Sequence, residues 1–222
     1  MYAAPWLTNS GHFAVKTPTL ARVLPLPDVR FPRRTRRRLE TRDRLFEASL
    51  AEFRRVGVGG AEIEDIIRRA RVARGTFYLH FPTKDHVLME LLRRKQAALA
   101  ERLAATRAGS VRGFLRRIVD LMVEDALADL ALCHELFAVI ARHAGEMRSE
   151  ASALSGTVGA FFATAQDRGE VRRDLTSTDL TNVFLPAVWG LLQMKLDAPA
   201  AELRAALYGV VDIFVRGMAA RA

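Results

Sequence analysis

The sequence is poor in cysteine and has no long hydrophobic run. Cys133 is the only cysteine among the 222 residues, so no intrachain disulfide can form, which favours a reducing setting. No apolar run approaches the roughly 18 residues that a membrane-spanning helix needs. The N-terminus also lacks the basic, apolar and small-residue regions of a secretory signal. We therefore expect a cytoplasmic protein with no membrane partner.

The sequence motifs of several large enzyme classes are also missing. We find no phosphate-binding loop, no G-x-G-x-x-G run, no G-x-S-x-G elbow and no H-E-x-x-H motif. We expect no catalytic residues and no cofactor. A metal site is conceivable where His134 and His143 stand nine residues apart, with Cys133 and Glu135 nearby. Ordinary pocket or surface histidines are the more common case, and we expect no metal.

Glycine, proline and alternating β-branched residues are sparse in the middle of the chain. Half of the residues are hydrophobic, which is enough for a sizeable core, and the length suits one large or two small domains. Apolar residues recur at the helical spacing of three and four. These features predict an all-α protein.

The positive charge is concentrated in the first part of the chain. The net charge is +9; residues 1–38 hold 8 basic and 1 acidic side chains, residues 39–95 hold 12 and 9, and residues 96–222 hold 14 and 15. A basic N-terminal part beside a nearly neutral remainder is typical of a protein that binds a phosphate backbone.

The first 35 residues carry five prolines and no sustained period, so we expect a disordered basic leader over residues 1–35. The leader closes on the arginine-rich run 33–38. This run could be the solvated start of a helix, or an arm that contacts DNA phosphates or the minor groove. The sequence leaves both interpretations open.

The central stretch 62–84 predicts two short helices joined by a tight turn. Residues 61–69 have a helical apolar stripe, about three connecting residues follow, and residues 74–80 form a second short segment before Pro82. This is the pattern of a helix-turn-helix, whose second helix enters the major groove of DNA. That helix carries hydrogen-bonding side chains suited to phosphates and base edges. They are Arg74, Thr76, Tyr78 and His80.

Further helices are expected on both sides of this stretch. One spans residues 35–56 and is followed by Gly57, and another begins at an N-cap residue, Thr83, and ends near residue 106. A second domain reads as five helices over residues 111–127, 130–143, 146–167, 178–196 with Thr178 as N-cap, and 199–218. We therefore place a three-helix DNA-binding domain at residues 36–95 and a helical ligand-binding and dimerisation domain at residues 96–222.

The run 75–84, G-T-F-Y-L-H-F-P-T-K, closely resembles the TetR family of transcriptional regulators, and the resemblance continues upstream through residues 41–53 to Gly57. It covers about residues 39–92. It implies a homodimer that binds a palindromic double-stranded DNA operator and a small effector. The DNA-facing positions that it implies are Thr41, Arg42, Arg74, Thr76, Tyr78, His80 and Lys84.

The sequence departs from the family pattern at both short helices. The residues that open the first are Ala61 and Glu62, where the family has Ser or Thr, and Ala73 stands where the family has Ser. Two side-chain caps are thus missing, each worth about 1 kcal/mol. Arg71 replaces the glycine of the turn, at a position expected to have positive φ.

Large apolar side chains of the second domain suggest a pocket for a hydrophobic molecule, although each of them taken singly is more simply explained as core. The candidate ligand-binding residues are Phe114, Met122, Phe137, Phe161, Phe162, Trp189 and Gln193. The last two helices carry more apolar residues than we expect one small domain to bury, which predicts a dimer interface. These residues are Leu185, Leu192, Leu203, Leu207, Val211 and Phe214.

The sequence as a whole predicts a DNA-binding transcriptional regulator, a repressor that a small apolar ligand releases. The alternative is a helical enzyme or small-molecule carrier that has kept a decayed helix-turn-helix. Salt-dependent binding to a DNA fragment separates the two.

Overall fold

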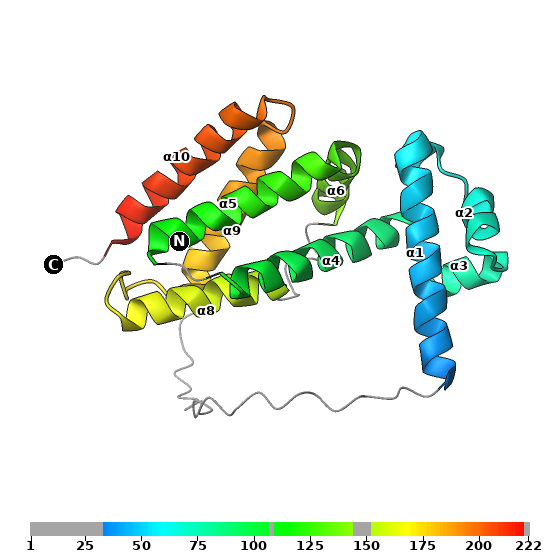
Figure 1. Cartoon of the computed structure of the whole chain (residues 1–222), viewed down its shortest axis with the longest axis horizontal. Helices are drawn as coiled ribbons and strands as arrows, with labels where there is room; N and C mark the ends of the chain where they lie inside the picture. Colours follow the sequence, from blue (N-terminus) through cyan, green and yellow to red (C-terminus); the bar gives the residue numbers. More distant parts are fainter. Residues whose placement is uncertain (1–32, 107–108, 144–151, 220–222) are drawn as a thin grey trace, which may run out of the picture. The chain divides into compact units, whose positions relative to one another are not determined.

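The computed structural model describes residues 33–106, 109–143 and 152–219. Over these residues the chain forms nine α-helices and no β-strand, as the sequence predicted (Figure 1). None of the described helices is both long and apolar enough to cross a membrane. Two hydrophobic cores organise the helices of residues 39–222.

The first core is built by α1 (Arg33–Gly60), α2 (Ile63–Ala70), α3 (Arg74–His80) and the first turns of α4 (Lys84–Ala104). Its centre holds large side chains that are fully buried: Leu45, Ile66, Phe77, Phe81 and Leu88. The three-helix arrangement expected from the sequence is therefore present, with α4 closing it.

The first helix is longer than expected at both ends. It begins at Arg33, whereas the sequence predicted a start near Thr35, so the arginine-rich run is helical and its side chains are exposed. Near its C-terminus the helix is interrupted at Gly57, where φ is +74°. Glycine adopts this angle without steric cost. The sequence predicted that the helix ends at Val56, and its uninterrupted part does end there, directly before Gly57. The leader before Arg33 lies outside the described residues.

The turn between α2 and α3 has the strained backbone that the sequence suggested. Arg71 has φ 55° and ψ 52°, the left-handed conformation, and its N–H bonds the last carbonyls of α2. The starts of both helices also lack side-chain caps, because Glu62 and Ala73 have extended backbones and make no capping hydrogen bond. Thr83 does stand at the N-cap position of α4, but the expected capping bond is absent: its hydroxyl pairs with His86 Nδ1 at 2.8 Å.

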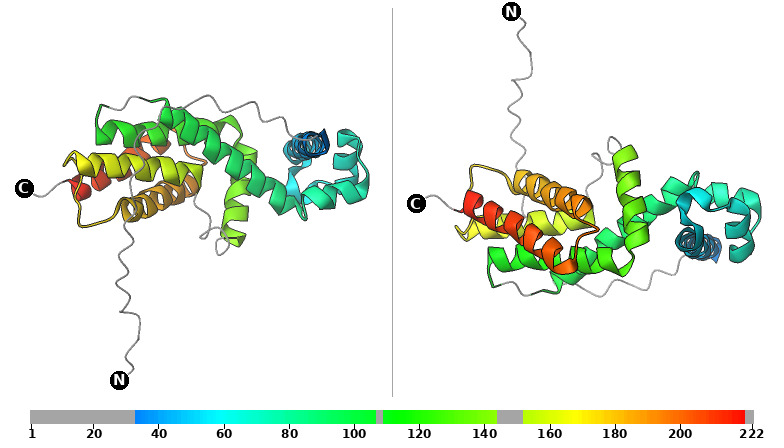
Figure 2. Two further views of the ribbon diagram at one scale, coloured as in Figure 1. Left: turned by 90° about the horizontal axis from the view of Figure 1, so that it is seen from below. Right: turned by 90° about the horizontal axis from the view of Figure 1, so that it is seen from above.

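The second core joins the C-terminal half of α4 to five further helices (Figures 1 and 2). They are α5 (Val111–Ala128), α6 (Leu130–Arg142), α8 (Ala153–Asp167), α9 (Ser177–Met194) and α10 (Ala200–Met218). α10 packs on α5 and α9, and α8 packs on α4 and α9. The helices expected from residues 111, 130 and 199 begin within one residue of those positions.

Two helix starts differ from the sequence expectation. The N-cap of α9 is Thr176 and not Thr178, because Thr176 and Asp179 bond each other's backbone N–H in a capping box, which satisfies two donors at once. α8 is described from Ala153; the earlier part of the segment predicted from residue 146 lies outside the described residues, which resume at residue 152.

α6 contributes to both cores. Leu132, Leu136 and Val139 pack into the first core, while Cys133 and Phe137 pack into the second. The helix lies against α4 (Figure 2). Any displacement of α6 therefore changes the packing of both cores.

The uncapped start of α3 gives a test of this local structure. Because Ala73 already has the extended backbone of an N-cap residue, Ala73→Ser should add the missing side-chain bond and raise the free energy of unfolding by about 0.5–2 kcal/mol. Thermal unfolding followed by circular dichroism measures the change. Ala98→Ser, on the exposed side of α4, is the control and should not stabilise the protein. An unchanged melting temperature for Ala73→Ser would show that the start of α3 needs no side-chain cap.

Candidate nucleic-acid interface and adjoining cavity

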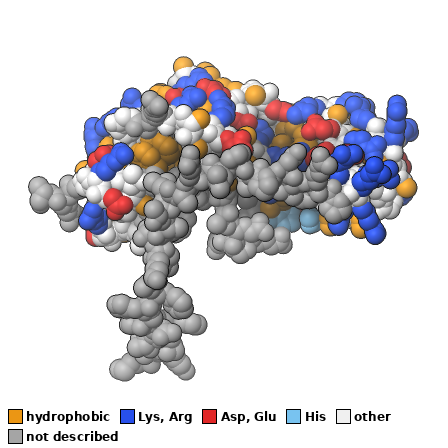
Figure 3. All heavy atoms as spheres, turned by 60° about the horizontal axis from the view of Figure 1, so that its bottom comes forward, with side chains coloured by type: hydrophobic (Ala, Val, Ile, Leu, Met, Phe, Trp, Pro, Cys, Tyr) orange, Lys and Arg blue, Asp and Glu red, His pale blue; other side chains and the backbone are white. Residues whose placement is uncertain are grey.

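α3 has one buried side and one outward side. Phe77 and Phe81 are fully buried, four residues apart, with their ring centroids 6.2 Å from each other. This anchoring turns the opposite side of the helix outward, where Tyr78 is 45% exposed and Leu79 is 68% exposed. Among the described residues the lysine and arginine side chains gather densely over the helix-turn-helix domain (Figure 3).

Arg74 lies on the outward side at the start of α3. Its guanidinium is paired with the Glu64 carboxylate of α2 at 2.5 Å. A hydrogen bond with Tyr78, and then the charge of Glu64, raise the pKa of Arg74 above its usual value. The side chain is therefore charged and accessible, and it is held by an acidic neighbour that DNA phosphates would have to outcompete.

His80 lies on the inner side of α3. It is only 8% exposed, and its carbonyl oxygen accepts a hydrogen bond of 2.9 Å from Arg42 Nη1. Thr76 is half-buried. Of the four α3 residues expected to face DNA, Arg74 and Tyr78 are thus the most accessible.

Arg42 fastens the end of α3 to α1 and α4. Besides the His80 carbonyl, its guanidinium meets the Glu90 carboxylate at 3.3 Å and lies 4.5 Å from the centre of the Phe81 ring. Burial opposes ionisation of Glu90, but hydrogen bonds from Arg93 and Arg94 lower its pKa to about 2. Glu90 is therefore charged at neutral pH, and it attracts the guanidinium of Arg42 toward the protein.

Lys84, expected to hold a phosphate, is directed toward the chain's own backbone. Its ammonium donates to the carbonyl oxygens of Val58 at 2.6 Å, Ala61 at 3.1 Å and Gly59 at 3.4 Å. An ammonium group has three N–H donors, so these bonds use all of them. Lys84 thus ties the start of α4 to the end of α1. Thr41, the remaining expected contact, is half-buried and accepts a hydrogen bond from Arg44 at 3.3 Å.

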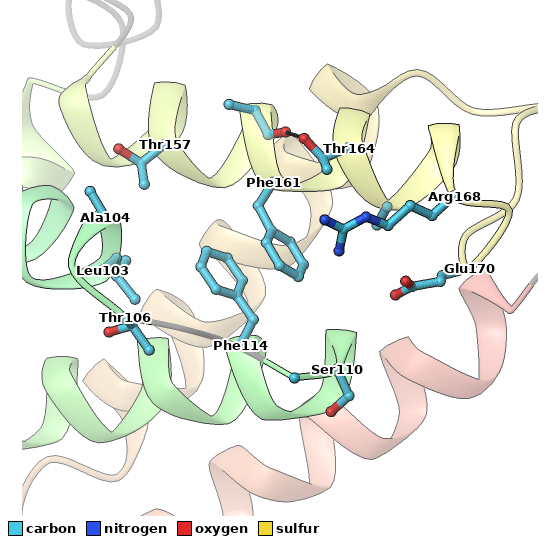
Figure 4. Close-up of a pocket in the computed structure, with 13 residues that line it drawn as sticks. Leu103, Ala104, Thr106, Ser110, Phe114, Thr157, Phe161, Thr164, Arg168 and Glu170 are labelled. Atoms are coloured by element: carbon cyan, nitrogen blue, oxygen red, sulfur yellow. Dashed lines mark hydrogen bonds between the residues drawn. The ribbon is translucent and has the colours of Figure 1, made fainter. Parts of the chain in front are cut away.

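A cavity of about 350 Å³ lies between the end of α4, the start of α5 and one face of α8 (Figure 4). The rings of Phe114 and Phe161 stack inside it, with centroids 3.7 Å apart and planes 9° from parallel. Arg168 and Glu170 point toward it from the end of α8 and the loop beyond. Its wall mixes apolar side chains with threonine and serine hydroxyls, and its charged groups lie only on that side.

Of the seven expected ligand-binding residues, Phe114 and Phe161 line this cavity and the other five do not. Met122 and Phe162 are buried in the second core. The other three lie elsewhere: Phe137 and Trp189 contact each other edge to face across α6 and α9 with centroids 5.5 Å apart, and Gln193 is exposed on α9.

Other lining residues of α8, among them Thr157 and Arg168, were not predicted. Together with the predicted Phe161 and with Thr164 they repeat at intervals of four, three and four, so they share one face of the helix. This spacing is visible in the sequence, but only the fold shows that the face borders a cavity.

The histidines once considered for a metal have separate partners. His134 pairs with Asp197 at 3.0 Å, and His143 pairs with Asp85 at 3.1 Å. Burial raises the pKa of the Cys133 thiol to about 11, so it is not a thiolate at neutral pH. In the parts of the chain that the structure describes, no three His, Cys, Asp or Glu side chains are grouped to hold a metal ion.

Comparison with known proteins agrees with this geometry. The family model described as bacterial regulatory proteins, tetR family, matches residues 45–91. The repressor SCO4008 of Streptomyces coelicolor is 31% identical over 80 residues, which are 36% of this chain and 41% of that protein. The regulator UidR of Escherichia coli is 25% identical over 162 residues, covering 68% of this chain and 80% of UidR. The match to SCO4008 covers less than half of that protein's length.

The fold is similar to that of FadR from Thermus thermophilus, a repressor solved with lauroyl-CoA, at a TM-score of 0.66 and 22% identity over 82% of this chain and 96% of that one. The fold and the outward side of α3 thus define an all-α protein of the helix-turn-helix class. The helix-turn-helix part, over residues 45–91, is of the kind found in the tetR family of bacterial regulatory proteins.

The bonds of Lys84 yield a prediction about stability. Lys84→Met keeps the aliphatic stem but leaves the Val58 and Ala61 carbonyls without their donor, so the free energy of unfolding should fall by about 1–3 kcal/mol. Chemical denaturation measures the loss. Lys195→Met, which removes only an exposed pair with Glu202, should change stability by less than about 1 kcal/mol. Equal effects of the two changes would contradict a structural role for Lys84.

Proposed function

We propose that the protein is a transcriptional repressor that binds a palindromic DNA operator as a homodimer and is released by a small apolar molecule. The observation that carries the proposal is the outward side of α3, which the burial of Phe77 and Phe81 holds in place. The related FadR structure is that of a repressor with a bound acyl-CoA. The alternative, an enzyme or carrier with a decayed helix-turn-helix, is less favoured because the first core is complete.

In the proposed complex α3 lies in the major groove. Arg74, Thr76 and Tyr78 are the candidates for base and phosphate contacts, and Thr41 contacts the backbone of the DNA. Arg42, His80 and Lys84, which the structure uses to hold helices together, act by positioning α3 and α4. DNA-binding and effector-binding parts are assigned to residues 36–95 and 96–222, a division supported by the two cores.

The arginine-rich start of α1 is assigned to phosphate contacts. Residues 33–38 are helical and exposed. An α-helix with side chains is about 10–12 Å wide, whereas the minor groove is only about 6 Å wide. The helical run is therefore too wide for the minor groove, which only an extended arm could enter. It fits phosphates along the DNA backbone better.

The pair between Arg74 and Glu64 makes DNA binding testable by a gain of affinity. Glu64→Gln removes a negative charge from the interface and frees Arg74, so affinity for duplex DNA should rise about 2- to 5-fold, as expected for an exposed ion pair. Duplexes selected from a random pool are titrated by fluorescence anisotropy at several salt concentrations. Glu101→Gln, exposed on α4, is the matched control.

Two further results complete this experiment. In an Arg74→Ala background the gain from Glu64→Gln should shrink, since no guanidinium remains to be released. Affinity should fall steeply with salt, because phosphate contacts release counterions. Salt-independent binding, or no binding to any duplex, would favour the enzyme or carrier alternative.

The homodimer is assigned to the outer faces of α9 and α10. The apolar residues first expected there do not form this surface: Leu185, Leu192, Leu203, Leu207 and Val211 are buried within the chain's own core, and Phe214 is half-buried. The outer faces instead expose Val183, Met194 and Ile213, with Ile213 75% exposed. Exposed glycines on both helices, Gly190 and Gly209, allow close approach of a second copy.

A charged substitution at this surface tests the dimer. Ile213→Glu places a carboxylate in the proposed apolar interface, and the dimer dissociation constant should rise at least about tenfold, since burying an unpaired charge costs several kcal/mol. Light scattering at micromolar concentration measures the mass. Leu127→Glu on α5 is the control and should remain dimeric. A monomeric wild-type protein, or a dimeric Ile213→Glu variant, would rule out this interface.

The effector is assigned to the cavity lined by Phe114 and Phe161. Leu103 and Ala104, at the end of α4, also line it, and the other end of α4 belongs to the first core. α6 strengthens this connection through ion pairs at both of its ends, Asp129 with Arg54 at 2.7 Å and Arg142 with Asp85 at 3.0 Å. A ligand that favours one position of α4 would therefore change the setting of α3.

The coupling between the two sites must be reciprocal. A molecule that enters the cavity should weaken operator binding about 5- to 150-fold, and operator should weaken that molecule's binding by the same factor. Fatty acids and phenols are screened by calorimetry, and a hit is titrated with and without operator.

A variant that fills the cavity provides the control. Thr157→Phe should abolish binding of the hit and leave operator affinity unchanged. Thr178→Phe, at an exposed position of α9, should change neither. Equal affinity of the wild-type protein for the hit with and without operator would eliminate release by a ligand in this cavity.

A further inference from the structure

The outward side of α3 carries an exposed apolar side chain. Leu79 is 68% exposed, and Tyr78 beside it is almost half exposed. Leu79 contributes nothing to the first core, which takes Phe77 and Phe81 from the other side of the helix. Leu79 is therefore mostly exposed to solvent on a helix of seven residues.

The polar side chains of α3 offer few donors for base edges. Arg74 is paired with Glu64, Thr76 is half-buried, and His80 lies on the inner side. Gly75 has no side chain. Unless Arg74 leaves its partner, the accessible groups of α3 are therefore the Tyr78 side chain, with its one hydroxyl, and the apolar side chain of Leu79.

Gly75 stands four residues before Leu79, so the two positions share one face of α3. A methyl group added at Gly75 would meet no atom of the chain within 4 Å, and the backbone there has no positive φ. The fold therefore does not require glycine at this position. Its effect is to leave open space beside Leu79, where another molecule can approach the helix closely.

The position of Leu79 is also fixed. Its neighbour Phe77 is fully buried, and the His80 carbonyl at the end of the helix is bonded to Arg42. Because α3 is held from both sides, the backbone at Leu79 is fixed and its side chain projects from a defined place on the helix. A defined apolar group can distinguish between surfaces, whereas one on a loose segment cannot.

The major groove offers one apolar group to such a side chain, the C5-methyl of thymine. Building on the proposed DNA binding, we infer that Leu79 is a specificity-determining residue that recognises a thymine methyl in each operator half-site, and that Gly75 provides the space for the base pair. Tyr78 borders this contact and adds a hydroxyl for a phosphate or base edge.

The test removes only the methyl group. Operator duplexes found by selection are remade with deoxyuridine in place of each thymine in turn. For the wild-type protein, one or two positions per half-site should lose about 4-fold in affinity, the effect of one buried methyl. Leu79→Ala should bind the thymine duplex correspondingly more weakly and should not distinguish thymine from deoxyuridine at those positions. Leu175→Ala, exposed in the loop before α9, should behave as wild type.

Gly75→Ala adds a second measurement that does not depend on loss of folding. Alanine is the better helix former, so the melting temperature should stay the same or rise, while operator affinity should fall because the added methyl group occupies the space beside Leu79. Stronger or unchanged operator binding by Gly75→Ala would contradict the inference.

The outcomes separate this inference from the proposed function. If no duplex is bound by the wild-type protein, the proposed function itself is wrong. If duplexes are bound but deoxyuridine has no effect, or affects Leu79→Ala as much as wild type, DNA binding stands and the role of Leu79 is overturned. Loss of the thymine preference in Tyr78→Ala, with Leu79→Ala unaffected, would overturn it in favour of Tyr78.

Discussion

Phe77 on α3 and Phe81 directly after it, four residues apart, occupy the centre of the first core, and both are fully buried. Burying each phenylalanine ring stabilises the fold by about 1.5–3 kcal/mol, a large contribution for a helix of seven residues. Since α3 is too short to be stable alone, this burial decides which side of it faces outward. The accessible Arg74, Tyr78 and Leu79 follow from it, as does the inner position of His80.

Polar contacts then hold α3 and α4 in register. Arg42 links the last carbonyl of α3 to Glu90 on α4, and Lys84 links the start of α4 to carbonyls near the end of α1. These bonds involve charged groups, which makes them stronger than neutral hydrogen bonds. They explain how the domain tolerates two uncapped helix starts and the left-handed Arg71: strain at the turn is offset by anchoring at the other end of α3.

α4 and α6 connect the second core to the first core, in which α3 is held. α4 extends from the first core to the cavity, while α6 places side chains in both cores and is paired at each end with a residue of α1 or α4. Closely packed protein interiors have low compressibility, so a displacement of α4 or α6 in one core is transmitted to the other. The stacked rings of Phe114 and Phe161, inside the cavity, are where we expect an effector to act.

Local periodicity and contiguous motifs were enough to predict the all-α class, the helix-turn-helix, its likeness to the tetR family and the positive φ at Arg71. The sequence could not show that Lys84 and Arg42 bond the chain's own groups, since their partners lie far away in the sequence. It likewise grouped seven residues as one pocket, whereas of these only Phe114 and Phe161 line the cavity, and it assigned buried leucines to a dimer surface. Composition gives the number of apolar side chains, but only tertiary packing decides which are core, which line a cavity and which remain exposed.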